Sequence, residues 1–218
     1  MNDYSLCTYV IGRKNDQTNL IELLGTGFLV GELIVTALHV VNGNDHNLCL
    51  VMPHISNIET YQDVENRQCQ SFPLTIKSAD PIRDICILTM PCRIHLSEEF
   101  PAWQLGTLDE IHVSEKIGIW GFPHCVDGRR VLTYQETELG AKLLMTTSEI
   151  KSKYGTVNIQ TRPGQSGSPV YSLATGRVVG LLVGAYAPEC GIRLGGINPY
   201  ELNQTSYCIS AEYIQDML

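Results

Sequence analysis

The sequence predicts an all-β protein, and three observations lead to that prediction. Short apolar runs recur along the chain, they are rich in Val, Ile and Thr, and turn residues such as Gly, Pro, Asn and Asp separate them. Apolar runs of about four to six residues between turn residues are typical of β-strands. Their repetition favours a β-barrel or a β-sandwich. Representative runs lie at 27–30, 33–36, 85–88 and 178–183.

The connecting segments follow from composition. Residues 95–102 are polar and contain a proline, which suits a crossing between two halves of the chain. The segment from Gly184 to Thr205 is rich in Gly, Pro and Asn, so we expect a long surface loop there. Residues 207–209 are expected to form the last strand.

A short helix is expected at the C-terminus. Ser210 can cap it, and Tyr213, Ile214 and Met217 would share one face. The helix is expected to run over 210–218.

Length and charge restrict the function classes. The 218 residues suffice for one large domain or two small barrels, and the hydrophobic fraction of 44% is ordinary for a globular protein. The net charge of −8 argues against nucleic acid and against an acidic membrane surface as partners. The chain has neither an apolar stretch of about 18 residues nor a signal-peptide pattern, so we expect a cytoplasmic protein.

The eight cysteines are interpreted as reduced thiols, most of them buried as small apolar side chains. In a secreted chain, eight cysteines would instead be interpreted as four disulfides. A zinc site is the other alternative, with Cys92, His95, His124 and Cys125 as its ligands. The pattern lacks a second spaced pair like Cys92 and His95, so we expect no metal.

The segment Gly164-Gln165-Ser166-Gly167-Ser168-Pro169 is the most informative one for chemistry. A serine hydroxyl becomes a useful nucleophile only when it is exposed on a tight turn near a base. Glycines on both sides let the backbone bend, so that the amides of Gly164 and Ser166 could hold a negative oxygen. An ordinary Gly-Ser turn is the alternative.

A histidine and an aspartate are the other two candidate catalytic residues, beside Ser166. His39 leaves an apolar strand, where a structural histidine is the commoner case. Asp84 opens a buried strand, where a carboxylate needs a partner. That partner could be an imidazole, as in a catalytic triad, or Asp84 could pair with Arg83 or cap a turn. Coincidence poorly explains the order His, Asp, Ser in a β-rich chain.

These segments resemble the trypsin-like peptidases. The resemblance rests on residues 25–28 and 36–39 before and at the histidine, on 84–88, and on the serine segment 164–169. Residues 105–107, 118–123 and 207–210 look more like the bacterial HtrA (Deg) and glutamyl-endopeptidase branches. The likeness spans nearly the whole chain.

The resemblance implies two six-stranded antiparallel β-barrels with an active site between them. In this reading, residues 1–218 form a single peptidase domain. The first barrel covers about 4–94, the crossing segment about 95–110, the second barrel about 111–209 and the C-terminal helix 210–218.

The implied activity is that of a serine endopeptidase, with His39, Asp84 and Ser166 as catalytic triad and an acyl-enzyme intermediate. It needs no metal or organic cofactor, and its partners would be protein or peptide substrates and a possible regulatory protein. Three departures from the family pattern are expected to matter. Val40 stands where secreted relatives carry a cysteine, and Gln165 cannot form the ion pair by which zymogen-type members bind a freed N-terminus. The HtrA-type PDZ domain would also be missing.

By position relative to Ser166, the resemblance implies a primary specificity pocket. Its expected residues are Gln160, Thr161, Val183, Gly184, Ala185 and Ser206. A charged substrate side chain would be unpaired there, and relatives that cut after glutamate use a histidine where Leu182 stands. We therefore expect a neutral, small-to-medium residue before the cut bond. Glu189 or Arg193 in the following loop could reverse that preference.

Two other functions remain open from the sequence. One is a viral-type polyprotein-processing protease, which shares the fold. The other is a catalytically silent binding module on the same fold, although such modules usually lose a triad residue and none is lost here.

Overall fold

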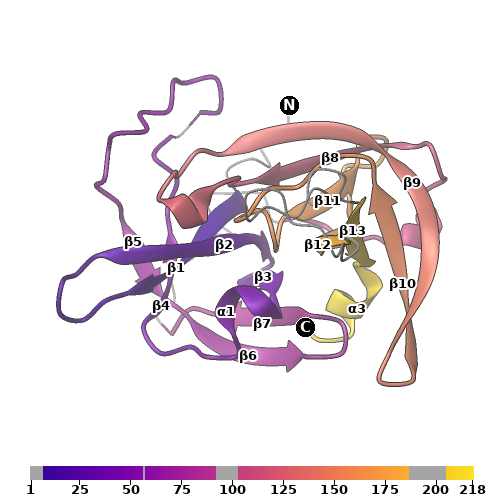
Figure 1. Ribbon diagram of the computed structural model, residues 1–218, viewed down its shortest axis with the longest axis horizontal. Helices are drawn as coiled ribbons and strands as arrows, with labels where there is room; N and C mark the ends of the chain where they lie inside the picture. Colours follow the sequence, from indigo (N-terminus) through magenta and orange to yellow (C-terminus); the bar gives the residue numbers. More distant parts are fainter. Residues whose placement is uncertain (1–6, 56, 92–102, 187–204) are drawn as a thin grey trace, which may run out of the picture.

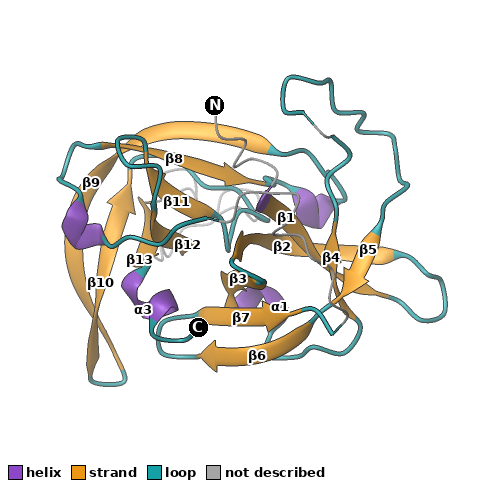
Figure 2. Cartoon of the chain, turned by 180° about the vertical axis from the view of Figure 1, so that it is seen from behind, coloured by secondary structure: helices purple, strands orange, loops and turns teal. Residues whose placement is uncertain are grey.

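Two β-sheets make up the protein, as a computed structural model shows (Figure 1). The structure describes residues 7–55, 57–91, 103–186 and 205–218. Within these ranges the chain is almost entirely strand and loop, and its helices are single turns (Figure 2). None of the described helices is long and apolar enough to cross a bilayer. The predicted all-β class is confirmed.

The first sheet contains seven strands from the N-terminal half. Their spatial order is β5 (Ser71–Pro73), β4 (Leu48–Val51), β1 (Thr8–Lys14), β2 (Ile21–Val30), β3 (Leu33–Ala37), β7 (Ile85–Thr89) and β6 (Thr75–Asp80). The sheet curves as half of a barrel, whereas six strands in a barrel were expected. The additional strand is β5, whose three residues pair with β4 at the edge of the sheet.

The second sheet closes into the expected six-stranded barrel. Around it run β10 (Ile150–Val157), β13 (Thr205–Ser210), β12 (Val178–Tyr186), β11 (Pro169–Ser172), β8 (Lys116–Gly121) and β9 (Thr133–Thr147). Because β12 continues to Tyr186, the loop expected from Gly184 begins later than predicted. Most of that loop, and residues 95–102 of the expected crossing, lie outside the described residues.

The C-terminal helix is shorter than the predicted 210–218. Helix α3 covers only Glu212–Gln215, and Ala211 occupies its N-cap position. Ser210 does not cap the helix because it ends β13, where it pairs with Gly180, and its Oγ accepts the Leu108 N–H at 3.2 Å. The three residues predicted to share a face do pack inward, since Ile214 is buried and Tyr213 and Met217 pack against the main core, but Met217 lies beyond the helix.

The C-terminal segment joins the two halves of the molecule. The Lys77 Nζ of β6 donates to the Leu218 carbonyl at 2.9 Å. Arg83, in the turn between β6 and β7, lies over the ring of Tyr213 at 4.3 Å and donates to Ser152 Oγ of β10 at 3.1 Å. The turn that precedes Asp84 is therefore supported from the second barrel.

The six cysteines within the described ranges are free thiols, and five of them are buried: Cys7, Cys49, Cys86, Cys125 and Cys208. Burial raises the pKa of Cys49 to about 11 and that of Cys86 to about 12. These two thiols therefore stay neutral and act as small apolar side chains. Two of the four residues of the alternative zinc site, Cys92 and His95, lie outside the described residues.

The Gly121-Phe122-Pro123 stretch has a structural explanation. A Cβ on Gly121 would lie 2.2 Å from the Oγ of Ser168, so only glycine leaves room for that hydroxyl. Phe122 packs in an apolar cluster with Val10, Cys49 and Val51 of the first sheet. The end of β8 thus fits closely between the serine segment and the first sheet.

We expect Gly121→Ala to destabilise the fold by about 1–3 kcal/mol, because its methyl group would overlap Ser168 Oγ. Ser168 Oγ is buried, and no described residue offers it a hydrogen bond, so Ser168→Ala alone should cost little. The double variant should then recover most of the loss. Urea unfolding of the three variants measures this coupling. Equal stability of the single Gly121→Ala variant and the double variant would contradict the proposed overlap.

Candidate active site

His39 is presented to solvent by a single helical turn. Helix α1 (Leu38–Val41) follows β3 directly, and Val40 and Val41 anchor it by packing in the core. The turn closes at Asn42, whose backbone is left-handed and whose N–H donates to the His39 carbonyl at 3.3 Å. The His39 side chain remains 47% exposed.

The Asp84 carboxylate holds His39. Asp84 Oδ2 lies 2.5 Å from His39 Nδ1, and Oδ1 accepts the His39 backbone N–H at 2.8 Å. The Asp84 carbonyl accepts the Leu38 N–H at 3.0 Å. Asp84 itself has φ of 59°, a conformation unusual for a residue with a side chain. Three contacts therefore fix both the ring and the helical turn that carries it.

Arg83 is not the partner of Asp84. It pairs with Asp80, whose Oδ2 lies 2.7 Å from Arg83 Nη1. Asp80 Oδ1 also accepts the backbone N–H groups of Ile82 and Arg83 at 2.9 and 3.1 Å, so Asp80 is the residue that caps this turn. Both alternatives considered for Asp84 from the sequence thus belong to Asp80.

The serine segment makes a tight turn against the first sheet. Gly164 and Gly167 have φ of 92° and 88°, which few other residues tolerate. A Cβ on Gly167 would lie 2.0 Å from the Thr26 carbonyl oxygen of β2. Ser166, between them, is partly exposed.

Thr26 ties this turn to the strand that leads to His39. Its N–H donates to the Ser166 carbonyl at 3.0 Å, and its Oγ1 donates to the Gly164 carbonyl at 2.7 Å. The same Oγ1 accepts the Phe122 N–H at 3.1 Å. Strand β2 pairs with β3, which ends one residue before α1, and β3 pairs with β7, which begins just after Asp84. The sheet therefore brings the three predicted segments together.

The peptide between Pro163 and Gly164 is oriented from outside the turn. Its carbonyl accepts the His124 N–H at 2.7 Å, at the start of η3 (Cys125–Asp127). In a trans peptide the N–H points opposite to the C=O, so the Gly164 N–H points away from η3. Among the described residues, no acceptor takes the N–H of Gly164 or that of Ser166. Both amides remain able to bind a ligand oxygen.

Gln165 holds the turn from within. Its side chain is fully buried, Oε1 accepts the Arg162 N–H at 2.7 Å, and Nε2 donates to Gln135 Oε1 of β9 at 2.5 Å. A neutral hydrogen-bond network thus surrounds Gln165, which stands where zymogen-type members carry the aspartate of an ion pair.

Several predicted pocket residues lie together beside the turn. Ser206 pairs with Ala185 across β12 and β13, and its Oγ donates to the Ile159 carbonyl at 2.8 Å. The same Oγ accepts the Thr161 N–H at 3.2 Å and lies 3.0 Å from Thr161 Oγ1. Gly184 precedes Ala185 in β12, next to an irregularity in the pairing at Val183. Gln160 is half-buried beside Thr161.

Of the four residues of the alternative zinc site, the structure describes only His124 and Cys125. His124 Nδ1 faces Asp127 Oδ2 at 3.4 Å, and Cys125 is buried beneath Gly164. Burial raises the pKa of the Cys125 thiol to about 12. Within the described residues no three metal-binding side chains form a group.

Sequence reasoning missed the roles of Thr26, Gln135 and the His124 amide. Thr26 belongs to the stretch 25–28 that we compared with the approach to the histidine, but nothing in that stretch indicates its bonds to Gly164 and Phe122. Gln135 gives no signal, because it lies on a strand of alternating polar residues.

A family model for the trypsin-like peptidase domain matches residues 25–181. A search of curated proteins found no significant match. Among solved structures, the MamO protease domain of Magnetospirillum magneticum is similar, with a TM-score of 0.68 at 13% identity. That match covers 99% of this chain and 97% of the other.

Two further structures have the same fold. The active form of the Rv3671c protease from M. tuberculosis has a TM-score of 0.68 at 19% identity, over 99% of this chain and 80% of that one. The HtrA-type protease AlgW, solved with a decapeptide, has a TM-score of 0.63 at 14% identity. The match covers 98% of this chain but only 63% of the AlgW chain.

Proposed function

Because the chain belongs to the trypsin-like peptidase family, we propose that it is a serine endopeptidase with His39, Asp84 and Ser166 as its catalytic triad. The observation that carries the proposal is the convergence of the His39–Asp84 pair and the Ser166 turn on one set of strands. An ordinary Gly-Ser turn would need neither an oriented imidazole nor two outward amides nearby.

The proposed mechanism assigns one task to each group. Asp84 occupies Nδ1 of His39, which leaves Nε2 as the ring nitrogen that accepts the Ser166 proton. Ser166 Oγ attacks the peptide carbonyl, and His39 then gives the proton to the leaving amine. In the second half, His39 takes a proton from a water molecule that attacks the acyl-enzyme, and it gives that proton to Ser166 Oγ as the acid product leaves.

The amides of Gly164 and Ser166 are the proposed oxyanion hole. Donors that are already oriented stabilise the developing charge without reorganisation during the reaction. The His124 bond to the Pro163 carbonyl and the Thr26 bond to the Gly164 carbonyl support this orientation. The Gln165–Gln135 network supports a turn that holds its shape without an ion pair to a freed N-terminus.

The test is labelling of the protein with a fluorophosphonate, which reacts only with an activated serine. We expect one label, on Ser166, and its loss in His39→Ala. Incubation with a proteome, followed by sequencing of the new N-termini, should reveal cut peptide bonds. A protein that takes up no label and makes no cuts would be a binding module.

We expect cleavage after neutral, small-to-medium residues such as Ala, Val, Leu, Thr or Gln. Among the described pocket residues there is no charged side chain, and the Ser206 hydroxyl is already bonded within the protein. An unpaired charge is costly in such surroundings. A peptide library measures the preference, and strong selection for Arg, Lys, Asp or Glu would contradict it. Gln160→Asp should raise cleavage after Lys and Arg, since it places a carboxylate at the expected base.

Thr26 is proposed as a positioning residue for the oxyanion hole. Thr26→Val keeps the shape but leaves the Phe122 N–H and the Gly164 carbonyl without their partner. We expect a loss of about 1–3 kcal/mol in stability and of roughly tenfold to a hundredfold in kcat, with a smaller change in KM. Thr26→Ser keeps the hydroxyl and should retain most of kcat. If Thr26 had a purely structural role, Thr26→Val would be less stable than the wild type, but its kcat would equal that of Thr26→Ser.

A further inference from the structure

A cavity of about 660 Å³ lies away from the serine turn, on the side of the β1–β2 hairpin. Three segments line it: the hairpin, residues 66–71, which lead into the start of β5, and residues 128–130 after η3. Its charged side chains are Lys14, Arg67 and Arg130, and no described carboxylate lines it. Its volume is in the range of small-molecule sites.

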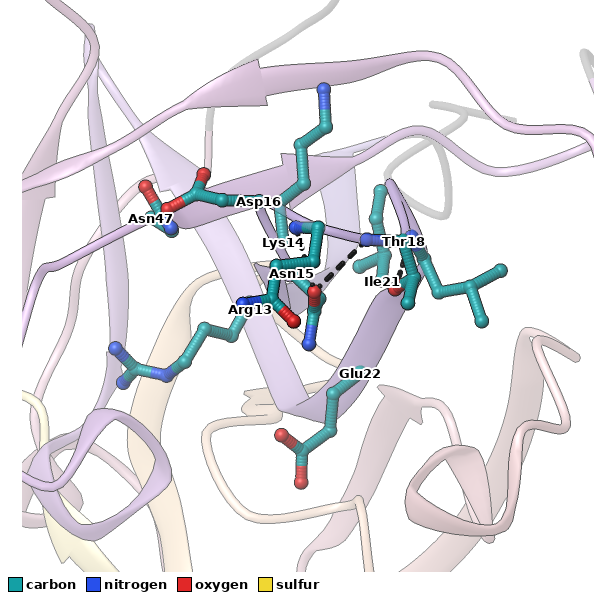
Figure 3. A pocket seen from close by; sticks show the side chains of 10 residues that line it. Arg13, Lys14, Asn15, Asp16, Thr18, Ile21, Glu22 and Asn47 are labelled. Carbon is teal, nitrogen blue, oxygen red and sulfur yellow. Dashed lines mark hydrogen bonds between the residues drawn. The ribbon is translucent and has the colours of Figure 1, made fainter.

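A neighbouring cavity differs from this one in the charges that line it. It measures about 780 Å³, shares Lys14 with the first, and is drawn in Figure 3. There Asp16 and Glu22 accompany Arg13 and Lys14, so both signs of charge are present. Of these two cavities, the first combines three cations with no described carboxylate, in a protein whose net charge is −8.

Arg130 is held by a backbone carbonyl and a histidine, and the Cys69 side chain also interacts with it. Its Nη2 donates to the Gln68 carbonyl at 2.6 Å, and its Nε donates to His54 Nε2 at 2.9 Å. Burial, followed by the charge of Arg130, lowers the pKa of His54, which keeps that acceptor neutral. Burial also lowers the pKa of Arg130. Among the described residues, no carboxylate lines the cavity beside this half-buried guanidinium.

The other two cations are also unpaired. Neither Lys14 nor Arg67 has a carboxylate within ion-pair distance among the described residues, whereas Arg83, Lys116, Lys153 and Arg177 all do. Arg67 Nη1 approaches Gly128, where a Cβ would lie 3.1 Å away. Arg67 thus leans toward the segment that carries Arg130. Like charges gathered around one space repel, and an anion between them would relieve that repulsion.

We propose that this cavity binds a small polyanion bearing phosphate or carboxylate groups. The Arg67 guanidinium can bind either kind of oxyanion with paired hydrogen bonds, whereas Arg130, whose Nε and Nη2 already donate within the protein, and Lys14 add positive charge. Asn66 and Ser71, also in the lining, supply neutral donors. The site is separate from the proposed catalytic residues, so binding does not depend on peptidase activity.

Isothermal titration of the whole protein with pyrophosphate and with citrate, at fixed ionic strength set by chloride, tests the proposal. We expect saturable binding of at least one probe at one site. A preference for pyrophosphate would assign phosphate groups to the ligand, and a preference for citrate would assign carboxylates.

Arg67→Gln and Lys14→Gln should each weaken binding by about tenfold. Both side chains are exposed, so the fold should survive. Lys151→Gln, which removes an exposed cation on β10, is the control with the same change in net charge and should bind as the wild type does. Absence of binding, or equal affinity in all three variants, would overturn the proposal.

Discussion

Ser166→Ala is expected to lower turnover of peptide substrates by about a millionfold, the scale on which a triad protease loses activity with its nucleophile. The variant keeps the oriented amides and the His39–Asp84 pair, but it has no oxygen to form the acyl-enzyme. Ser166 is partly exposed, so the free energy of unfolding should change by less than about 1 kcal/mol. Kinetics on an internally quenched peptide measure the turnover, and urea unfolding measures the free energy of unfolding.

Ser168→Ala is the matched control, two residues further along the same segment. Its hydroxyl is buried beneath Gly121 and has no hydrogen-bond partner among the described residues. Its removal should leave kcat within a few fold of the wild type. Hydrolysis by pure Ser166→Ala well above background would falsify the assignment of the nucleophile.

The fold class and the three candidate segments could be predicted because each depends on a local pattern. Apolar runs between turn residues mark strands, and glycines around Ser166 mark a turn with positive φ, which Gly164 and Gly167 have. The pairing of β3 with β7 then brings His39 and Asp84 together. Local patterns and the chain order of the three residues were therefore sufficient to predict that His39 and Asp84 lie together.

The contacts that hold the turn could not be predicted, because they join residues far apart in the chain. Thr26 and Gly164 are separated by 138 positions, and Gln165 and Gln135 by 30. Nothing near Thr26 indicates that its hydroxyl bridges two backbone groups of the second barrel. The net charge is limited in the same way, because it depends only on composition. A value of −8 for the whole chain does not show that Lys14, Arg67 and Arg130 line one cavity.

The end of the last strand illustrates a competition that sequence cannot decide. Serine is a good N-cap residue, yet Ser210 is the final residue of β13, because the ladder to Gly180 occupies its backbone. The helix therefore begins two residues later and makes a single turn.

Asp84→Asn is expected to lower turnover by about four orders of magnitude. The asparagine can still accept the His39 N–H through its oxygen, so the helical turn should stay in place. Its NH₂ group would face Nδ1 as a donor, which forces the ring proton onto Nε2. His39 could then no longer accept the Ser166 proton, and kcat should fall far more than KM rises.

Asp80→Asn makes the same chemical change four residues earlier and serves as the control. Burial opposes ionisation of Asp80, but Arg83 and two backbone N–H groups outweigh it and lower the pKa of the carboxyl. A lowered folded-state pKa adds stability above the unfolded value of about 3.9, and that stability is lost as pH falls through the lower folded value. Asp80→Asn should thus be less stable than the wild type at neutral pH, and the difference should shrink in acid. Its kcat should remain within about tenfold of the wild type, because the amide oxygen can still cap the turn before Asp84. If Asp84→Asn proved as active as Asp80→Asn, a carboxylate other than Asp84 would have to orient His39.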